Sequence, residues 1–185
     1  ETDDLFEQAM NTSDQEILYE TLIQHNKQSI NELLNISKNI YTDVVSSFIK
    51  EDIKTLRRVS NDCRLAKEEM KQLKRKEIMI MRRLDDKMIN KNTWFHLSYN
   101  CIEQILYALR RICDPCKEYV DNSFTPLDKK YLPEVESLKE KVIWSIDTAD
   151  ITISTSEYSD VDGVMERIKT REDEVVEMSH EQMDR

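Results

Sequence analysis

Glycine is nearly absent from this sequence of 185 residues: it occurs once, and proline occurs three times. Tight turns and β-hairpins depend on these two residues, so the chain cannot make many close reversals. Long elements with few connections are the alternative, and a charged fraction of 35% suits amphipathic helices. We therefore expect an all-α protein. The single glycine also excludes a glycine-rich phosphate-binding loop, and the sequence contains no Gly-x-Ser-x-Gly nucleophile motif.

Long apolar runs are missing as well. No stretch approaches eighteen consecutive apolar residues, so no segment is predicted to span a membrane by itself. The chain begins Glu-Thr-Asp-Asp, without an initiator methionine or the basic-then-apolar pattern of a signal peptide. We therefore expect a piece excised from a longer protein. The four cysteines stand within helical patterns, mostly on apolar faces, which favours reduced thiols in a cytoplasmic setting.

Positive charge is scarce in the C-terminal part of the chain. The formal net charge is −10, and residues 134–185 carry 15 acidic and 6 basic side chains. Nucleic-acid binding and adsorption to anionic lipid both rest on clustered cations, so this balance argues against either. The charge excess is typical of a solubilising surface.

Apolar residues recurring every three or four positions predict five helices. The expected ranges are 13–50, 52–89, 93–121, 127–154 and 160–185, with a short helical turn inside 1–12. Ser13 and Glu16 have the spacing of a capping box at the first start, and Asp52 is the expected N-cap of the second helix. Pro115 predicts a kink or a break in the third helix.

The third predicted helix has the broadest apolar face, so we place it at the centre of an antiparallel bundle. The residues expected to be buried there are Leu97, Cys101, Ile105, Leu109 and Ile112. In the first helix His25 and Asn26 interrupt the stripe, which favours a role in helix register over ligand binding. The basic run Lys71–Lys76 is typical of solvated helix surface, and docking to an acidic partner is the alternative.

Two short motifs contain residues that could support redox or metal chemistry, but their surroundings in the sequence do not suit it. Cys-Asp-Pro-Cys at 113–116 lies near a helix end, whereas a redox pair normally begins a helix after a strand and a structural zinc needs four ligands. We therefore favour packing at a kink, with redox and metal roles as alternatives. Glu177 and His180 form one Glu-x-x-His, but a di-iron bundle needs two such motifs. We expect no cofactor and no enzymatic activity.

Residues 94–127, WFHLSYNCIEQILYALRRICDPCKEYVDNSFTPL, resemble the third helix and following turn of PhoU-like domains. The resemblance is closest to those at the cytosolic C-terminus of bacterial sodium–phosphate cotransporters, where the turn reads His-Val-x-Asn-x-His-x-Pro-Leu. Here the turn keeps Val120, Asn122, Pro126 and Leu127 and lacks both histidines.

The resemblance implies a fold of two antiparallel three-helix repeats. Residues 13–125 would form the first repeat and 126–185 two helices of an incomplete second, in one continuous bundle with a sixth helix beyond Arg185. PhoU-like proteins often carry a Glu-x-x-x-Asp metal motif on the third helix. Glu103 matches its acid, but Tyr107 stands at the aspartate position, so the metal site would be broken.

The function that the resemblance implies is that of a non-enzymatic regulatory domain of a sodium-dependent inorganic phosphate transporter. It would lie on the cytoplasmic side of the inner membrane and contact the membrane domain of the same transporter, upstream of Glu1. A helical scaffold or adaptor unrelated to phosphate and a carboxylate–metal bundle are the alternatives. Apolar stripes on the last two helices also predict a homodimer, unless those helices fold back to close a five-helix bundle.

Overall fold

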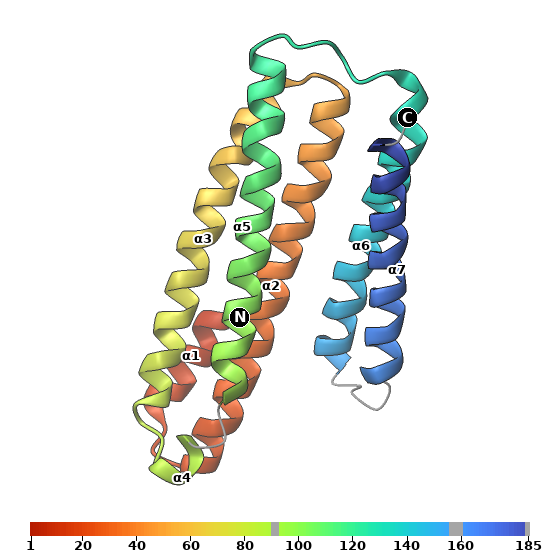
Figure 1. Ribbon diagram of the computed structural model, residues 1–185. Coiled ribbons are helices and arrows are strands. Elements are labelled where there is room, and N and C mark those ends of the chain that lie inside the picture. The colour runs from red at the N-terminus through yellow and green to blue at the C-terminus, as the bar shows by residue number, and fades with distance from the viewer. Residues whose placement is uncertain (90–92, 156–160, 184–185) are drawn as a thin grey trace.

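The computed structural model describes residues 1–89, 93–155 and 161–183, which are helical almost throughout. Three long helices run side by side (Figure 1): α2 (Gln15–Ile49), α3 (Ile53–Met81) and α5 (Thr93–Asp121). Two shorter helices lie at one end of this bundle, α1 (Thr2–Asn11) and α4 (Asp86–Ile89). The chain continues through a 3₁₀ turn, η1 (Lys129–Tyr131), into α6 (Leu132–Thr155) and α7 (Val161–Met183). Within these described ranges there is no strand, which confirms the expected all-α class.

The second predicted helix is wrong at its C-terminal end, because α3 stops at Met81 and residues 82–85 form a turn before α4. The side-chain amide of Gln15 bridges this turn: its Nε2 donates to the Arg83 carbonyl (3.1 Å) and its Oε1 accepts from the Asp85 amide (2.8 Å). Arg83 in turn donates to the carbonyl of Thr12 (2.7 Å) at the end of α1. The break therefore depends on contacts with the first fifteen residues and has no local sequence signal.

The start of α2 also differs from the expected capping box at Ser13. Asp14 is the N-cap, and its Oδ1 accepts from the amides of Glu16 (3.0 Å) and Ile17 (3.1 Å). A carboxylate is favoured there because the helix dipole places positive charge at the N-terminus. The predicted cap of α3 is confirmed: Asp52 accepts from the Thr55 amide at 3.2 Å.

Two helices end in left-handed residues that are not glycine. Glu51 follows α2 with φ 54°, and Ser123 follows α5 with φ 53°. In both turns the next amide bonds back five residues, from Asp52 to the Ser47 carbonyl (2.8 Å) and from Phe124 to that of Tyr119 (3.2 Å). This is the Schellman pattern of helix C-termini, which usually has glycine at the left-handed position. The chain thus makes sharp reversals without glycine, at some cost in backbone strain.

Helix α5 continues past Pro115 to Asp121, so the break that we considered is absent. Pro115 lies on the exposed side of the helix. Water can therefore satisfy the carbonyl one turn earlier that loses its partner to the proline ring.

Helix α2, and not α5 as expected, occupies the centre. It packs against α1, α3, α5 and α6, whereas α5 packs mainly against α2 and α3. Ser29, Ser37 and Ser47 are buried along α2, and such small residues let neighbouring helices approach from several sides. The hydroxyls of Ser29 and Ser37 bond to carbonyls one turn back in their own helix, at 2.8 and 2.7 Å.

The buried face of α5 is rotated from the predicted one. Leu109 is buried as expected and Ile105 and Ile112 are half-buried, but Leu97 is 63% exposed and Cys101 is exposed. The residues that are buried are Phe95, Tyr99, Ile102, Leu106, Leu109 and Cys113. Apolar residues surround much of this helix, so periodicity alone leaves the facing direction ambiguous. The two aromatic rings favour the interior because they remove the most apolar surface from water.

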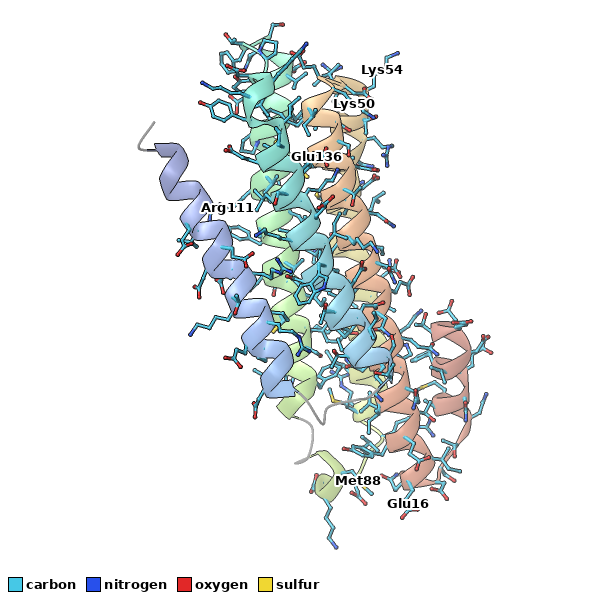
Figure 2. The ribbon with its side chains drawn as sticks, turned by 90° about the vertical axis from the view of Figure 1, so that its right-hand side faces the viewer. Glu16, Lys50, Lys54, Met88, Arg111 and Glu136 are labelled. Atoms are coloured by element: carbon cyan, nitrogen blue, oxygen red, sulfur yellow. The ribbon has the colours of Figure 1, made fainter. Side chains whose placement is uncertain are left out.

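Helix α6 folds back on the bundle. Its apolar residues Val142, Ile146, Ala149 and Ile153 pack, partly buried, against the core cluster that contains α2, and Lys38 pairs with Asp147 at 2.6 Å. Figure 2 shows α6 between α2 and α7, which packs against its outer side. Of the two alternatives given for the last two helices, α6 therefore follows the one in which they fold back on the bundle. No helix of the described ranges is long and apolar enough to cross a membrane. The division into repeats at 13–125 and 126–185 remains a prediction.

Candidate functional site

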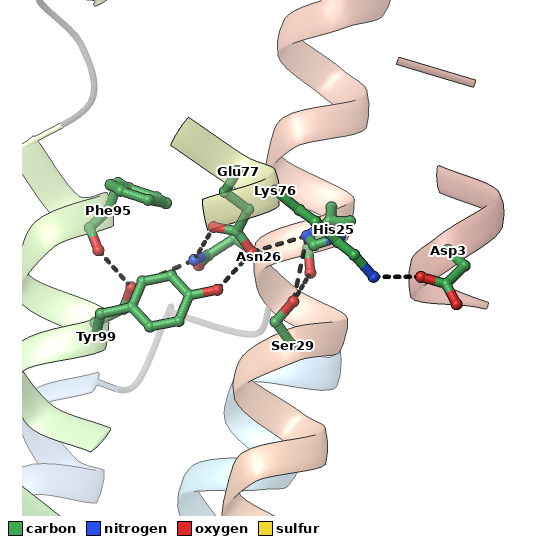
Figure 3. A network of polar contacts seen from close by, with 9 residues as sticks. Asp3, His25, Asn26, Ser29, Lys76, Glu77, Phe95 and Tyr99 are labelled. Atoms are coloured by element: carbon green, nitrogen blue, oxygen red, sulfur yellow. Dashed lines mark hydrogen bonds and ion pairs between the residues drawn. The ribbon is translucent and has the colours of Figure 1, made fainter. Parts of the chain in front are cut away.

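A buried polar centre joins the three long helices where α2, α3 and α5 meet (Figure 3). Helix α2 contributes His25 and Asn26, α3 contributes Glu77, and α5 contributes Tyr99. The carboxylate of Glu77 lies in the middle. Its Oε1 accepts from the Tyr99 hydroxyl (2.8 Å) and lies 2.8 Å from His25 Nδ1, while its Oε2 accepts from Asn26 Nδ2 (2.9 Å).

This centre is closed to solvent. The exposed fraction is 0% for both His25 and Glu77 and 1% for Tyr99. Burial, together with the neighbouring Glu77 carboxylate, raises the pKa of the Tyr99 phenol above its usual range, so the hydroxyl stays a hydrogen-bond donor. A buried carboxylate is costly unless it is fully hydrogen-bonded, and three donors from two other helices meet that need here.

The geometry gives the centre a structural role. The partners of Glu77 come from two other helices, adjacent residues of one turn of α2 and Tyr99 of α5, so the contacts form together in only one relative position of α2, α3 and α5. The contacts of His25 and Asn26 with Glu77 on α3 agree with the predicted role in helix register. His25 Nε2 is buried and has no hydrogen-bond partner among the described residues.

An open groove lies between α3 and α5, with a cavity volume of about 780 Å³. Glu103 and Tyr107, the positions compared with a metal motif, both line it. Tyr107 is 61% exposed, and the Arg111 guanidinium lies 5.8 Å from the centre of its ring. Within the part of the chain that the structure describes, no three His, Cys, Asp or Glu side chains are grouped so as to hold a metal ion. A metal role for Glu103 stays a prediction.

The cysteines of the 113–116 motif point to different surroundings. Cys113 is buried, and its Sγ lies 3.4 Å from that of Cys63 on α3, with both thiols free. That contact lowers the pKa of Cys63 and, together with burial, raises the pKa of Cys113. Burial raises the pKa of Cys116. These thiols are therefore packed side chains, in agreement with the packing interpretation.

The other sequence signals give no site. The basic run on α3 is divided, because Leu73 is buried, Lys71 pairs with Glu68 on the same helix and Lys76 pairs with Asp3 of α1. The side chain of His180 lies outside the described residues, so the Glu-x-x-His motif is not placed.

Comparison with models of protein families, with curated proteins and with solved structures found no match.

Sequence reasoning missed Glu77 and Tyr99. A signal for Glu77 was present, because it occupies the apolar stripe of α3 between Leu73 and Ile80, at helical spacing. A lone acid in such a stripe indicates a buried, partnered carboxylate. The groove also had a signal: Arg57, Arg64 and Lys67 follow one another at steps of seven and three on one helix face.

Proposed function

We propose that this chain is a non-enzymatic regulatory domain, PhoU-like in kind, of a sodium-dependent inorganic phosphate transporter. It acts on the cytoplasmic side of the inner membrane through contacts with the transporter's membrane domain. The proposal rests on the resemblance of residues 94–127, and the observed order of three long helices followed by a further helix pair agrees with it.

The observation that carries the proposal is the ordered junction formed by residues 118–127, where the resemblance is most specific. The ring of Tyr119 packs edge-on against Phe48 of α2 and Phe124, at centroid distances of 5.6 and 5.2 Å. Its hydroxyl donates to the carbonyl of Thr125 at 2.5 Å. Val120 packs, partly buried, against the main core. The motif is therefore built into the junction between the bundle and α6, which is where the resemblance implies a link between repeats.

A binding role also suits the chemistry of the candidate site. The acid and the histidine of the buried centre bond to each other and are closed to solvent, so they are not available to a substrate. The accessible groove is lined mainly by cations, amides and apolar side chains, a set that suits recognition of a surface.

The coding sequence upstream of Glu1 gives the first test. The proposal expects repeated apolar segments of roughly twenty residues, each long enough to span a bilayer. A longer protein without such segments would overturn the proposal.

Uptake of ³²P-phosphate by cells expressing that longer protein gives the functional test. We expect sodium-dependent uptake, and we expect deletion of residues 1–185 to leave transport but to abolish its response to phosphate supply. Full-length protein in the membrane without sodium-dependent uptake, or deletion without effect on the response, would count against the proposal.

A helical interaction module unrelated to phosphate is the second candidate, and the basic groove favours it. The same upstream sequence separates the two, because this candidate requires no membrane-spanning partner in the same chain.

A further inference from the structure

The groove between α3 and α5 has a marked excess of positive charge. Four cationic side chains line it, Arg57, Arg64 and Lys67 from α3 and Arg110 from α5, against the single carboxylate of Glu103. Its apolar lining includes Met70 and Leu106, which are buried, and Tyr107, which is largely exposed. A surface of this kind favours a partner that carries both apolar and acidic side chains.

Two of the four cations, Arg57 and Arg110, form ion pairs, and the other two, Arg64 and Lys67, form none among the described residues. Arg57 pairs with Asp121 at 2.7 Å, and Arg110 pairs with Asp114 at 3.2 Å. Arg64 bonds only to the neutral side chain of Asn61, at 3.1 Å. Lys67 has no ion pair among the described residues. The middle of the groove is therefore the part best suited to new carboxylates.

The shape of the groove fits a helix. Its α3 wall runs from Arg57 to Met70, which is about 20 Å at the α-helical rise. Helix-in-groove recognition uses an apolar face seated between two helices, with charges along the rim.

Helix α7 of the same sequence has the complementary face. At about 100° per residue, eight of the residues 162–177 fall within an arc of about 140° on α7. This face, which we call the acidic face, is exposed and consists of Asp162, Met165, Glu166, Lys169, Glu172, Asp173, Val176 and Glu177. It contains five acids and one lysine, and Met165 and Val176 are 59% and 48% exposed. Its length, from Asp162 to Glu177, is about 22 Å.

We propose that the groove between α3 and α5 binds the acidic face of α7 from a second copy of this chain. Within one chain α7 packs against α6, and α6 against α2, while the groove opens to solvent between α3 and α5. The two complementary surfaces are therefore on different faces, and a two-fold dimer fills both grooves at once. Each chain then contributes one groove and one α7, which doubles the buried area toward the roughly 1,200–2,000 Å² of a stable interface. This inference does not rest on the proposed transporter role.

The experiment is a charge-reversal cycle on the chain of residues 1–185, read by sedimentation velocity across a concentration series. The wild type should dimerise, and raising the salt from about 0.05 to 0.5 M should weaken the dimer because exposed charges are screened. Reversing the groove (Arg64→Glu with Lys67→Glu) should raise the dimer dissociation constant by at least about tenfold. Reversing the acidic face (Glu172→Lys with Asp173→Lys) should do the same. The chain carrying all four changes should recover most of the wild-type affinity.

Lys54→Glu with Arg75→Glu is the matched control. Both residues are exposed on α3 outside the groove, so the charge change is the same but the dimer should persist. Circular dichroism checks that every variant stays helical. A wild type that remains monomeric up to millimolar concentration overturns the proposal, as does a dimer unaffected by either reversal. If groove reversal abolishes the dimer and the α7 changes do not restore it, α7 is not the occupant of the groove. Binding of an added polyanion at the groove would then identify a different ligand.

Discussion

Tyr99→Phe tests the buried centre most directly, because it removes one hydroxyl and leaves the ring in place. Tyr99 is 1% exposed and its hydroxyl donates to Glu77 Oε1 at 2.8 Å. A hydrogen bond to a charged acceptor contributes about 1.5–3 kcal/mol to stability. The carboxylate keeps its contacts with His25 and Asn26, so we expect the middle of that range, about 2 kcal/mol lost from the free energy of unfolding.

Urea unfolding followed by circular dichroism at 222 nm measures this loss. For a chain of this size about 2 kcal/mol corresponds to a fall in Tm of roughly 4–8 °C. Tyr107→Phe is the matched control: that ring is 61% exposed and its hydroxyl makes no hydrogen bond to a described residue. A surface change of this kind should stay within about 0.5 kcal/mol. If the two variants lose the same stability, Glu77 is not held by Tyr99 in solution, and Tyr99 does not fix the register of α5.

Three further tests, which use five substitutions, probe other parts of the structure by unfolding measurements. Leu109→Ala should lower the free energy of unfolding by about 2–5 kcal/mol, and Leu97→Ala by under about 0.5 kcal/mol. The reverse order would mean that the face of α5 predicted from the sequence is the buried one. Glu51→Gly should stabilise the fold by about 0.5–1 kcal/mol, because glycine adopts the left-handed conformation without strain. Lys50→Gly, one position earlier at a right-handed residue, should destabilise the fold. Equal effects of the two changes would show that Glu51 is not strained. Asp52→Ala should lower Tm at neutral pH. Hydrogen bonds from the Thr55 side chain and amide hold the Asp52 pKa below its usual range, so its contribution is present at neutral pH and is lost as the pH falls through that lowered pKa. The difference in Tm between wild type and Asp52→Ala should therefore narrow in acid, and a constant difference would contradict this assignment.

The sequence predicted the fold class and most helix boundaries because their causes are local. A near absence of glycine and proline removes the alternatives to long helices, and Asp52 caps α3 through the amide three residues on. The break at residues 82–85 could not be predicted in this way. It is made by Gln15 and by the end of α1, roughly seventy positions away in the chain.

The prediction of which face of α5 is buried was wrong for a different reason. The helix has apolar residues on most of its circumference, so both Leu97 and Phe95 fit a helical stripe. Burial of the two large rings favours Phe95 and Tyr99, and the Tyr99 hydroxyl also supplies the buried donor that Glu77 on α3 needs. The sequence indicated half of the candidate site, because His25 and Asn26 interrupt the apolar stripe of their helix. The other half depends on which side chains of α3 and α5 contact these two residues.

The buried centre and the groove are connected through register. Long helices with apolar stripes can exchange one packed position for another by sliding one turn, about 5.4 Å, with little change in apolar burial. Such a slide of α3 against α5 would remove Glu77 from Tyr99 and would also move Arg64 and Lys67 past Tyr107. The hydrogen bonds of Glu77 oppose the slide, because in any other position the buried carboxylate would be left unpaired. Glu77 thus fixes the alignment of cations along the groove, some ten residues away on the same helix. Tyr99→Phe should therefore weaken the proposed dimer even where the chain remains folded, whereas Tyr107→Phe keeps the alignment and should leave the effect of groove reversal unchanged.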